Sequence, residues 1–155
     1  RWEADQGHFA DRNPFLGLCN PSSPPLYLRN EGELTLGKVV FDYRFEGAPG
    51  YVHGGVLSAV FDQLFGSVMI CSEKPAMTGE LSVRYLKPTP LKREIGLEGR
   101  IVGSEGRRVF CEGSMIFGGE TLVTGECTMV RIDDERLLKI FDPAIRTRAE
   151  EEEGS

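Results

Sequence analysis

Apolar and polar residues alternate through much of the second half of the chain, a pattern typical of strands with one buried face. The runs predicted as strands are Thr78–Tyr85, Arg93–Val102, Arg107–Phe117 and Thr121–Ile132. The pair Gly118-Gly119 separates the last two runs and predicts a hairpin turn. An earlier run, Leu34–Phe45, is rich in Val, Phe and Tyr and predicts a further long strand.

One segment, from Gly54 to about Ser72, has the spacing of a helix. Its apolar residues are Val56, Leu57, Val60, Phe61, Leu64, Phe65 and Val68. Because these residues lie almost all round the helix, we expect it to be buried. A single apolar helix among so many strands is buried if the sheet curls around it. The pattern therefore predicts an α+β domain, with an antiparallel sheet of about five to six strands wrapped around one long central helix.

The two ends of the chain differ from this central domain, which we place at residues 34–132. Residues 1–33 are rich in proline turns and predict an irregular segment that packs on the domain, with a short helix near Gln6–Asp11. Residues 133–155 predict a short helix over Asp134–Phe141 and then a disordered acidic tail. A chain of 155 residues is the size of one domain.

Charge and composition narrow the choice of partners. The net charge is −6 and no basic cluster exceeds two residues, which argues against nucleic acid. No stretch approaches the roughly 20 apolar residues that span a bilayer, and the first residues do not resemble a secretory signal. The cysteines, Cys19, Cys71, Cys111 and Cys127, are far apart, which favours reduced thiols in a cytoplasmic protein. With two histidines in the chain, we expect no metal site.

The start of the predicted helix carries the candidate chemistry. His53-Gly54-Gly55 comes directly before the apolar run, and Asp62 lies within it. A helix N-terminus offers unpaired backbone N–H groups and a partial positive charge. The glycines allow a ligand oxygen to approach the backbone closely. The segment therefore predicts a site that polarises a carbonyl group and attacks it.

Asp62 lies on a small, polar side of the helix with Gly55, Ser58, Gly66 and Met69. An acid on a helix is ordinarily exposed to solvent. In a helix that is otherwise apolar, we expect this one to be buried and either hydrogen-bonded or functional. For His53 both a structural and an active-site role stay open, and the glycines alone would be explained by a tight turn.

These residues resemble a known family. The His53-Gly54-Gly55 lead-in, with Asp62 seven residues after Gly55, resembles the hotdog-fold acyl-CoA thioesterases of the PaaI-like (phenylacetate-pathway) group. The strand that begins at Thr78 and ends in Tyr85-Leu86-Lys87-Pro88, and the turn at Gly106-Arg107-Arg108, resemble the same group. One feature departs from it. Some members carry Asn or Gln shortly before His-Gly-Gly, whereas residues 46–50 contain no amide side chain.

The resemblance implies hydrolysis of acyl-CoA to free acid and CoA. The Gly55 amide would polarise the thioester carbonyl, and Asp62 would act as general base on water or as the nucleophile. Thr78 would orient the water or the carboxylate, with His53 nearby. The family draws each site from two subunits, which implies a homodimer or a homotetramer built as a dimer of dimers. Coenzyme A is part of the substrate, and no other cofactor is expected.

The anionic coenzyme needs cations, and Gly106-Arg107-Arg108 is the best candidate because arginine suits phosphate. Lys87 and Arg84 are further candidates, and Gly54 and Tyr85 are expected to contact the substrate. Each charge is explained equally well as an ordinary solvated strand end. The apolar residues Phe61, Leu64 and Phe65 would line either an acyl pocket or simply the core.

Two other functions remain as alternatives. A non-catalytic acyl-CoA sensor would keep the pocket and lose the acid, so Asp62 and Thr78 argue against it. An enoyl-CoA hydratase needs an Asp and a His a few residues apart on a loop-helix segment, which this arrangement matches poorly. The acyl group, and whether it is carried by coenzyme A or by a carrier protein, is not set by the sequence.

Overall fold

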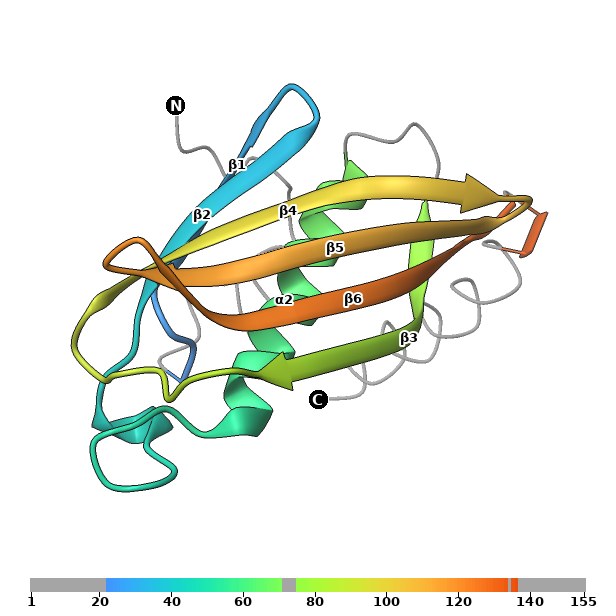
Figure 1. The fold of residues 1–155 in the computed structure, drawn as a ribbon. Helices are drawn as coiled ribbons and strands as arrows, with labels where there is room; N and C mark the ends of the chain where they lie inside the picture. The colour runs from blue at the N-terminus through green and yellow to red at the C-terminus, as the bar shows by residue number, and fades with distance from the viewer. Residues whose placement is uncertain (1–21, 71–74, 134, 137–155) are drawn as a thin grey trace, which may run out of the picture.

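The chain forms one antiparallel sheet and one long helix in a computed structural model, which describes residues 22–70, 75–133 and 135–136 (Figure 1). The strands are β1 (Leu26–Glu31), β2 (Leu34–Val40), β3 (Ala76–Tyr85), β4 (Glu94–Glu105), β5 (Arg108–Phe117) and β6 (Glu120–Arg131). The helix is α2 (Gly54–Ile70), preceded by a short 3-10 helix, η1 (Tyr43–Phe45). The sheet order is β1-β2-β4-β5-β6-β3, so β1 and β3 are its edges. The predicted fold class is confirmed.

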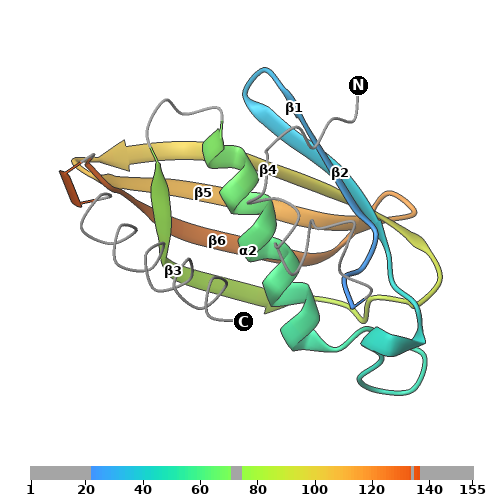
Figure 2. The ribbon, with the colours of Figure 1, turned by 180° about the vertical axis from the view of Figure 1, so that it is seen from behind.

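Helix α2 lies against one face of the curved sheet (Figure 2). Its buried residues are Leu57, Val60, Phe61, Leu64, Phe65, Ser67, Val68 and Met69. The opposite side, which includes Gly55 and Asp62, is exposed. The expectation that Asp62 is buried is therefore wrong for a single chain. The reason is that the curled sheet covers only one side of the helix. The sheet stops at its edge strand β3, so the side of the helix beyond β3 stays open.

A row of glycines lets the helix approach the sheet closely. Gly99, Gly113 and Gly125 are directly paired across β4, β5 and β6. A Cβ on Gly125 would lie 2.7 Å from Cδ1 of Phe61, and one on Gly99 would lie 3.0 Å from Cγ of Leu64. Real Cβ atoms essentially never lie closer than 3.0 Å to another heavy atom, and Phe61 and Leu64 are both fully buried. The absence of side chains at these positions therefore makes room for the rings and leucines of α2.

Two predictions near the N-terminus are wrong. The strand expected over Leu34–Phe45 ends at Val40, because Asp42 caps η1 and accepts a hydrogen bond from the Arg44 amide at 2.9 Å. The 3-10 turn of η1 brings Phe45 into contact with Phe41, with ring centroids 6.0 Å apart. Residues 26–31, expected to be irregular, form β1, which pairs along its whole length with β2.

The remaining elements agree with the sequence. Strands β3 to β6 match their predicted ranges within three residues at each end. The hairpin between β5 and β6 turns at Gly118 and Gly119, which both have positive φ. Of the predicted helix Asp134–Phe141, the structure describes residues 135–136, which are helical. The rest of that helix, the predicted helix at Gln6–Asp11, the helix end at Ser72 and the acidic tail lie outside the described residues. No helix in the described part of the chain has the length and apolar character that crossing a bilayer requires.

Two free thiols, Cys111 and Cys127, lie opposite each other on β5 and β6 in the core. Burial raises the pKa of Cys111 from about 9 to about 11. Burial raises the pKa of Cys127 to about 12, with smaller contributions from the charges of Cys111 and Asp62. The Cys127 thiol also contacts Sδ of Met129 at 3.3 Å.

These thiols predict how stability depends on alkaline pH. The unfolded chain loses thiol protons near pH 9, before the folded chain does, so unfolding becomes more favourable as pH rises from there towards 11 and 12. The stability that the thiols contribute is complete below about pH 8.5. Unfolding in urea between pH 8 and 11 should show this decline, and a Cys111→Ala/Cys127→Ala variant should show a flatter one. Equal slopes would contradict the burial of the thiols.

Candidate active site

Asp62 and Thr78 form the centre of the candidate site. The Thr78 hydroxyl donates to Oδ1 of Asp62 at 2.6 Å, which joins the open side of α2 to the start of β3. The same hydroxyl lies 3.7 Å from Sδ of Met129 on β6. A carboxylate that is held on one side and open to solvent on the other can accept a proton from water or attack a carbonyl carbon.

The His53-Gly54-Gly55 turn forms the first turn of α2. The carbonyl oxygen of His53 accepts hydrogen bonds from the amides of Val56 and Leu57, at 3.0 and 3.3 Å. The Gly55 amide donates to Nδ1 of the His53 side chain at 3.0 Å. The Gly55 amide therefore points outward and has an imidazole acceptor where a substrate oxygen could bind. This bond also requires that Nδ1 carries no proton.

Tyr85 holds the end of β3 to this turn. Its hydroxyl donates to the carbonyl oxygen of Gly54 at 2.8 Å and lies 2.7 Å from Oγ of Ser58. Its ring packs against Gly54, where an added Cβ would lie 3.3 Å from Cζ. Tyr85 was expected to contact substrate, and the structure gives it intramolecular partners. Ser58, which shares the polar side of α2, had no assigned role in the sequence.

Within one chain the two halves of the site are separated. Gly55 and Asp62 are seven residues apart on a helix, which corresponds to about 10 Å. Thr78 and Tyr85 are seven residues apart on β3, about 23 Å along an extended strand. The His-Gly-Gly turn and Tyr85 thus lie at one end, and the Asp62–Thr78 pair lies at the other. A single thioester carbonyl cannot contact both within one protomer.

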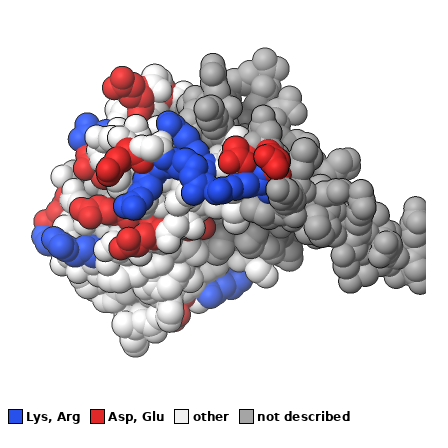
Figure 3. Space-filling view, turned by 90° about the vertical axis from the view of Figure 1, so that its right-hand side faces the viewer, with Lys and Arg blue, Asp and Glu red and all other residues white. Residues whose placement is uncertain are grey.

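Arginines gather at the Thr78 end of the sheet. Gly106, with φ of 58°, turns the chain between β4 and β5, and Arg107 and Arg108 follow it. Arg131 at the end of β6 joins them, because its amide bonds to the Arg107 carbonyl at 2.8 Å. Figure 3 shows blue side chains gathered on this end of the molecule, with red acidic side chains beside them. Sequence reasoning missed Arg131, since it lies far from the Gly-Arg turn along the chain.

The other predicted cations lie elsewhere. Lys87 follows the opposite end of β3 and pairs with Glu120. Arg84 is one residue before Tyr85, at that same end. The predicted substrate-binding residues are therefore divided between the two ends of β3, with Gly106, Arg107 and Arg108 near Thr78 and with Gly54, Tyr85 and Lys87 near the start of α2.

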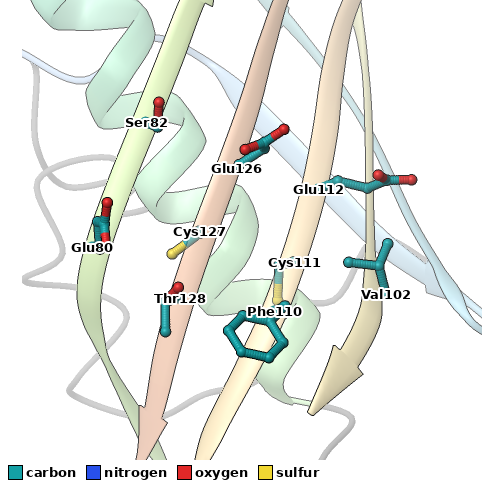
Figure 4. Close-up of a pocket in the computed structure, with 9 residues that line it drawn as sticks. All are labelled: Glu80, Ser82, Val102, Phe110, Cys111, Glu112, Glu126, Cys127 and Thr128. Carbon is teal, nitrogen blue, oxygen red and sulfur yellow. The ribbon is translucent and has the colours of Figure 1, made fainter. Parts of the chain in front are cut away.

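A shallow hollow of about 220 Å³ lies over strands β3 to β6, away from the Asp62–Thr78 pair and the turn. Figure 4 shows its lining, which includes the acidic residues Glu80, Glu112 and Glu126. A neighbouring hollow of about 450 Å³ shares Glu112 and Glu126 and adds Glu98. Because these carboxylates would repel an anionic ligand, the hollows do not suit the phosphates of a coenzyme.

Comparison with known proteins identifies the family. A family model described as the thioesterase superfamily matches residues 49–124, from just before the His-Gly-Gly turn into β6. The hotdog domain is therefore similar to the thioesterase superfamily over these residues. The match includes Gly55, Asp62 and Thr78, and it confirms the family that the sequence resembles.

One curated relative is the mouse acyl-coenzyme A thioesterase THEM4, which is 46% identical over 46 residues. The match covers 30% of this chain and 20% of that relative. The chain therefore spans far less than the whole length of that relative.

Solved structures share the fold. A thioesterase superfamily protein is 32% identical, with a TM-score of 0.73, and the match covers 76% of this chain and 62% of that one. The PaaI protein of E. coli is 11% identical, with a TM-score of 0.65, over 70% of this chain and 80% of its own. A Streptococcus pneumoniae thioesterase solved with coenzyme A is 19% identical, with a TM-score of 0.64, over 68% of this chain and 87% of its own. That thioesterase has also been solved with an aspartate or a threonine replaced by alanine.

Proposed function

We propose that this protein hydrolyses acyl-CoA thioesters to the free acid and CoA, with Asp62 as general base or nucleophile. The observation that carries the proposal is the 2.6 Å hydrogen bond between Thr78 and Asp62 on the open side of α2. The aspartate and threonine replaced in the S. pneumoniae thioesterase are 16 positions apart, the same separation as Asp62 and Thr78. The named relatives support the reaction class.

The Gly55 amide polarises the thioester carbonyl in this proposal. The carbonyl oxygen replaces Nδ1 of His53 as the acceptor of the Gly55 N–H, and the imidazole turns aside. As water or the carboxylate attacks, negative charge develops on that oxygen. A backbone donor placed there stabilises this charge, and losing one such donor costs about 3 kcal/mol of barrier. Thr78 keeps the Asp62 carboxylate oriented towards the attacked carbon.

A second copy of the chain completes the site. Strand β3 is a ten-residue edge with most side chains exposed, which is a surface suited to pairing with another strand. When two β3 edges pair antiparallel about a twofold axis near their middle, Thr78 of one chain lies near Tyr85 of the other. This pairing brings Asp62 of one chain to the Gly55 amide of the second. We propose this dimer, alone or as half of a dimer of dimers, as the active form.

Arg107, Arg108 and Arg131 bind the phosphates of coenzyme A in this arrangement, because they form a basic end beside the Asp62–Thr78 pair. Replacing both Arg107 and Arg108 by Ala should raise KM for acyl-CoA about tenfold or more, at nearly unchanged kcat. Steady-state kinetics tests this against acyl-N-acetylcysteamine thioesters, which lack phosphates and should show no change. Arg100→Ala, on the outer face beside Glu112, is the matched control. An equal rise in KM for both substrates would contradict phosphate binding.

One assay separates the candidate functions. A panel of acyl-CoAs is incubated with the protein, and free thiol, hydrated product and bound ligand are measured. Thiol release at a catalytic rate supports the thioesterase. Tight binding without turnover would support an acyl-CoA sensor, and hydration of a crotonyl-type substrate without thiol release would support a hydratase. Acyl groups on a carrier protein, tested alongside, decide between the two thioester sources.

A further inference from the structure

The three groups Ser58, Tyr85 and Gly54 form a directional chain of hydrogen bonds. A carbonyl oxygen can only accept, so the single hydroxyl hydrogen of Tyr85 is used on Gly54 O at 2.8 Å. The contact between Tyr85 and Ser58, at 2.7 Å, must then have Ser58 as the donor. The chain therefore runs from the Ser58 hydroxyl through the Tyr85 hydroxyl to the Gly54 carbonyl.

This chain ends on the peptide group that the proposed mechanism uses. The carbonyl of Gly54 and the N–H of Gly55 belong to the same peptide bond, whose atoms share delocalised electrons. A hydrogen bond to the oxygen draws electron density away from the nitrogen and makes the N–H a stronger donor. Successive hydrogen bonds polarise one another, by about 10–30% per bond. The donor in question is the one that now contacts Nδ1 of His53.

The packing around Tyr85 favours this geometry. The ring lies against Gly54, whose missing side chain leaves an added Cβ only 3.3 Å from Cζ and 3.4 Å from the hydroxyl oxygen. Tyr85 comes from the last position of β3, so the sheet edge and the helix start are joined at this peptide. Both partners of the hydroxyl belong to the first turns of α2.

We propose that Tyr85 is a positioning residue that, together with Ser58, polarises the Gly54–Gly55 peptide and strengthens the Gly55 N–H as the donor to the thioester carbonyl. The inference rests on the proposed function for its catalytic consequence. The polarisation of the Gly55 amide does not depend on any enzymatic activity, and it can be measured in the protein without substrate.

The first test is the amide resonance of Gly55 in protein labelled with ¹⁵N-glycine. Tyr85→Phe removes the hydroxyl and keeps the ring, so the Gly55 proton should shift upfield while glycines far from the turn stay in place. Ser58→Ala should give a smaller shift in the same direction. Tyr43→Phe is the matched control, because that exposed tyrosine contacts Lys92 through its ring. A Gly55 proton that does not move in Tyr85→Phe would overturn the proposal.

The second test is kinetic. Tyr85→Phe should lower kcat about 3- to 10-fold, with KM within about twofold, because a polarised donor acts mainly on the developing oxyanion. Ser58→Ala should lose less. The double variant should match Tyr85→Phe alone, since Ser58 acts through Tyr85. Losses that multiply, or a change in KM alone, would overturn the relay. If no acyl-CoA is turned over, the proposed function fails, and the Gly55 resonance still decides the relay.

Discussion

Asp62→Asn is expected to abolish thiol release from acyl-CoA while leaving the fold intact. The amide keeps the size of the side chain and retains an oxygen that can accept the Thr78 hydroxyl, now at 2.6 Å from Oδ1. It can neither take a proton from water nor attack the carbonyl. General acid–base catalysis contributes about 10²- to 10⁴-fold, and the loss in kcat should lie in that range or beyond. Thiol release and thermal unfolding, measured on the same preparation, check both parts.

Two further variants serve as comparisons for Asp62→Asn. Glu98→Gln removes an exposed carboxylate on the outer face of the sheet and should leave turnover unchanged. Thr78→Val removes the hydroxyl that orients Asp62 and should reduce kcat by less than Asp62→Asn does. Retention of more than about a tenth of wild-type kcat in Asp62→Asn would contradict a base or nucleophile role, because the expected loss is at least 10²-fold.

Gly125→Ala is expected to destabilise the fold by overpacking the contact between helix α2 and the sheet. The added Cβ would lie 2.7, 2.9 and 3.0 Å from three ring atoms of Phe61, which is fully buried. Phe61 is stacked on Phe65, with centroids 5.8 Å apart, so its ring has little room to withdraw. Overpacking of this kind costs about 1–3 kcal/mol and occasionally more. Urea unfolding of the variant measures the change in the free energy of unfolding.

Gly96→Ala is the matched control for Gly125→Ala. It adds the same methyl group to a central strand, where the nearest heavy atom is the Ile116 carbonyl oxygen at the ordinary distance of 3.6 Å. Its free energy of unfolding should change by less than about 0.5 kcal/mol, as expected for substitutions away from tight packing. Equal effects of the two substitutions would show that the glycine row does not set the distance between helix and sheet.

The sequence predicted the sheet and helix well because their patterns are local. Alternation from Thr78 to Ile132 and the apolar run after Gly54 each reflect which side of an element is buried. The predicted strand Leu34–Phe45 was too long because Asp42 caps the 3-10 helix η1 and ends the extended backbone. The hydrogen bond of this cap cannot be read from the alternation of apolar and polar residues. Strand β1 was missed because the prolines that precede it indicate turns, and the whole segment 1–33 was therefore predicted to be irregular.

The candidate site was predicted in part for a different reason. Asp62 and Thr78 were each singled out, and their hydrogen bond joins elements that the fold alone brings together. Arg131 and Ser58 were missed because their importance comes from neighbours far away in sequence. The exposure of Asp62 in a single chain could not be predicted from the helix pattern. An apolar helix surface indicates that the helix is covered, but it does not show whether the sheet of the same chain or a second chain covers it.

The most direct test of the shared site combines two inactive chains. One carries Asp62→Asn, and the other carries Gly55→Val, whose side chain would push against His53 and block the approach of a carbonyl oxygen to the amide. The chains are co-expressed with different tags, and the mixed dimer is purified through both. A site built from two chains predicts about half of wild-type turnover per dimer, because one site keeps its Asp62 and its Gly55. A mixed dimer as inactive as either homodimer would contradict the account.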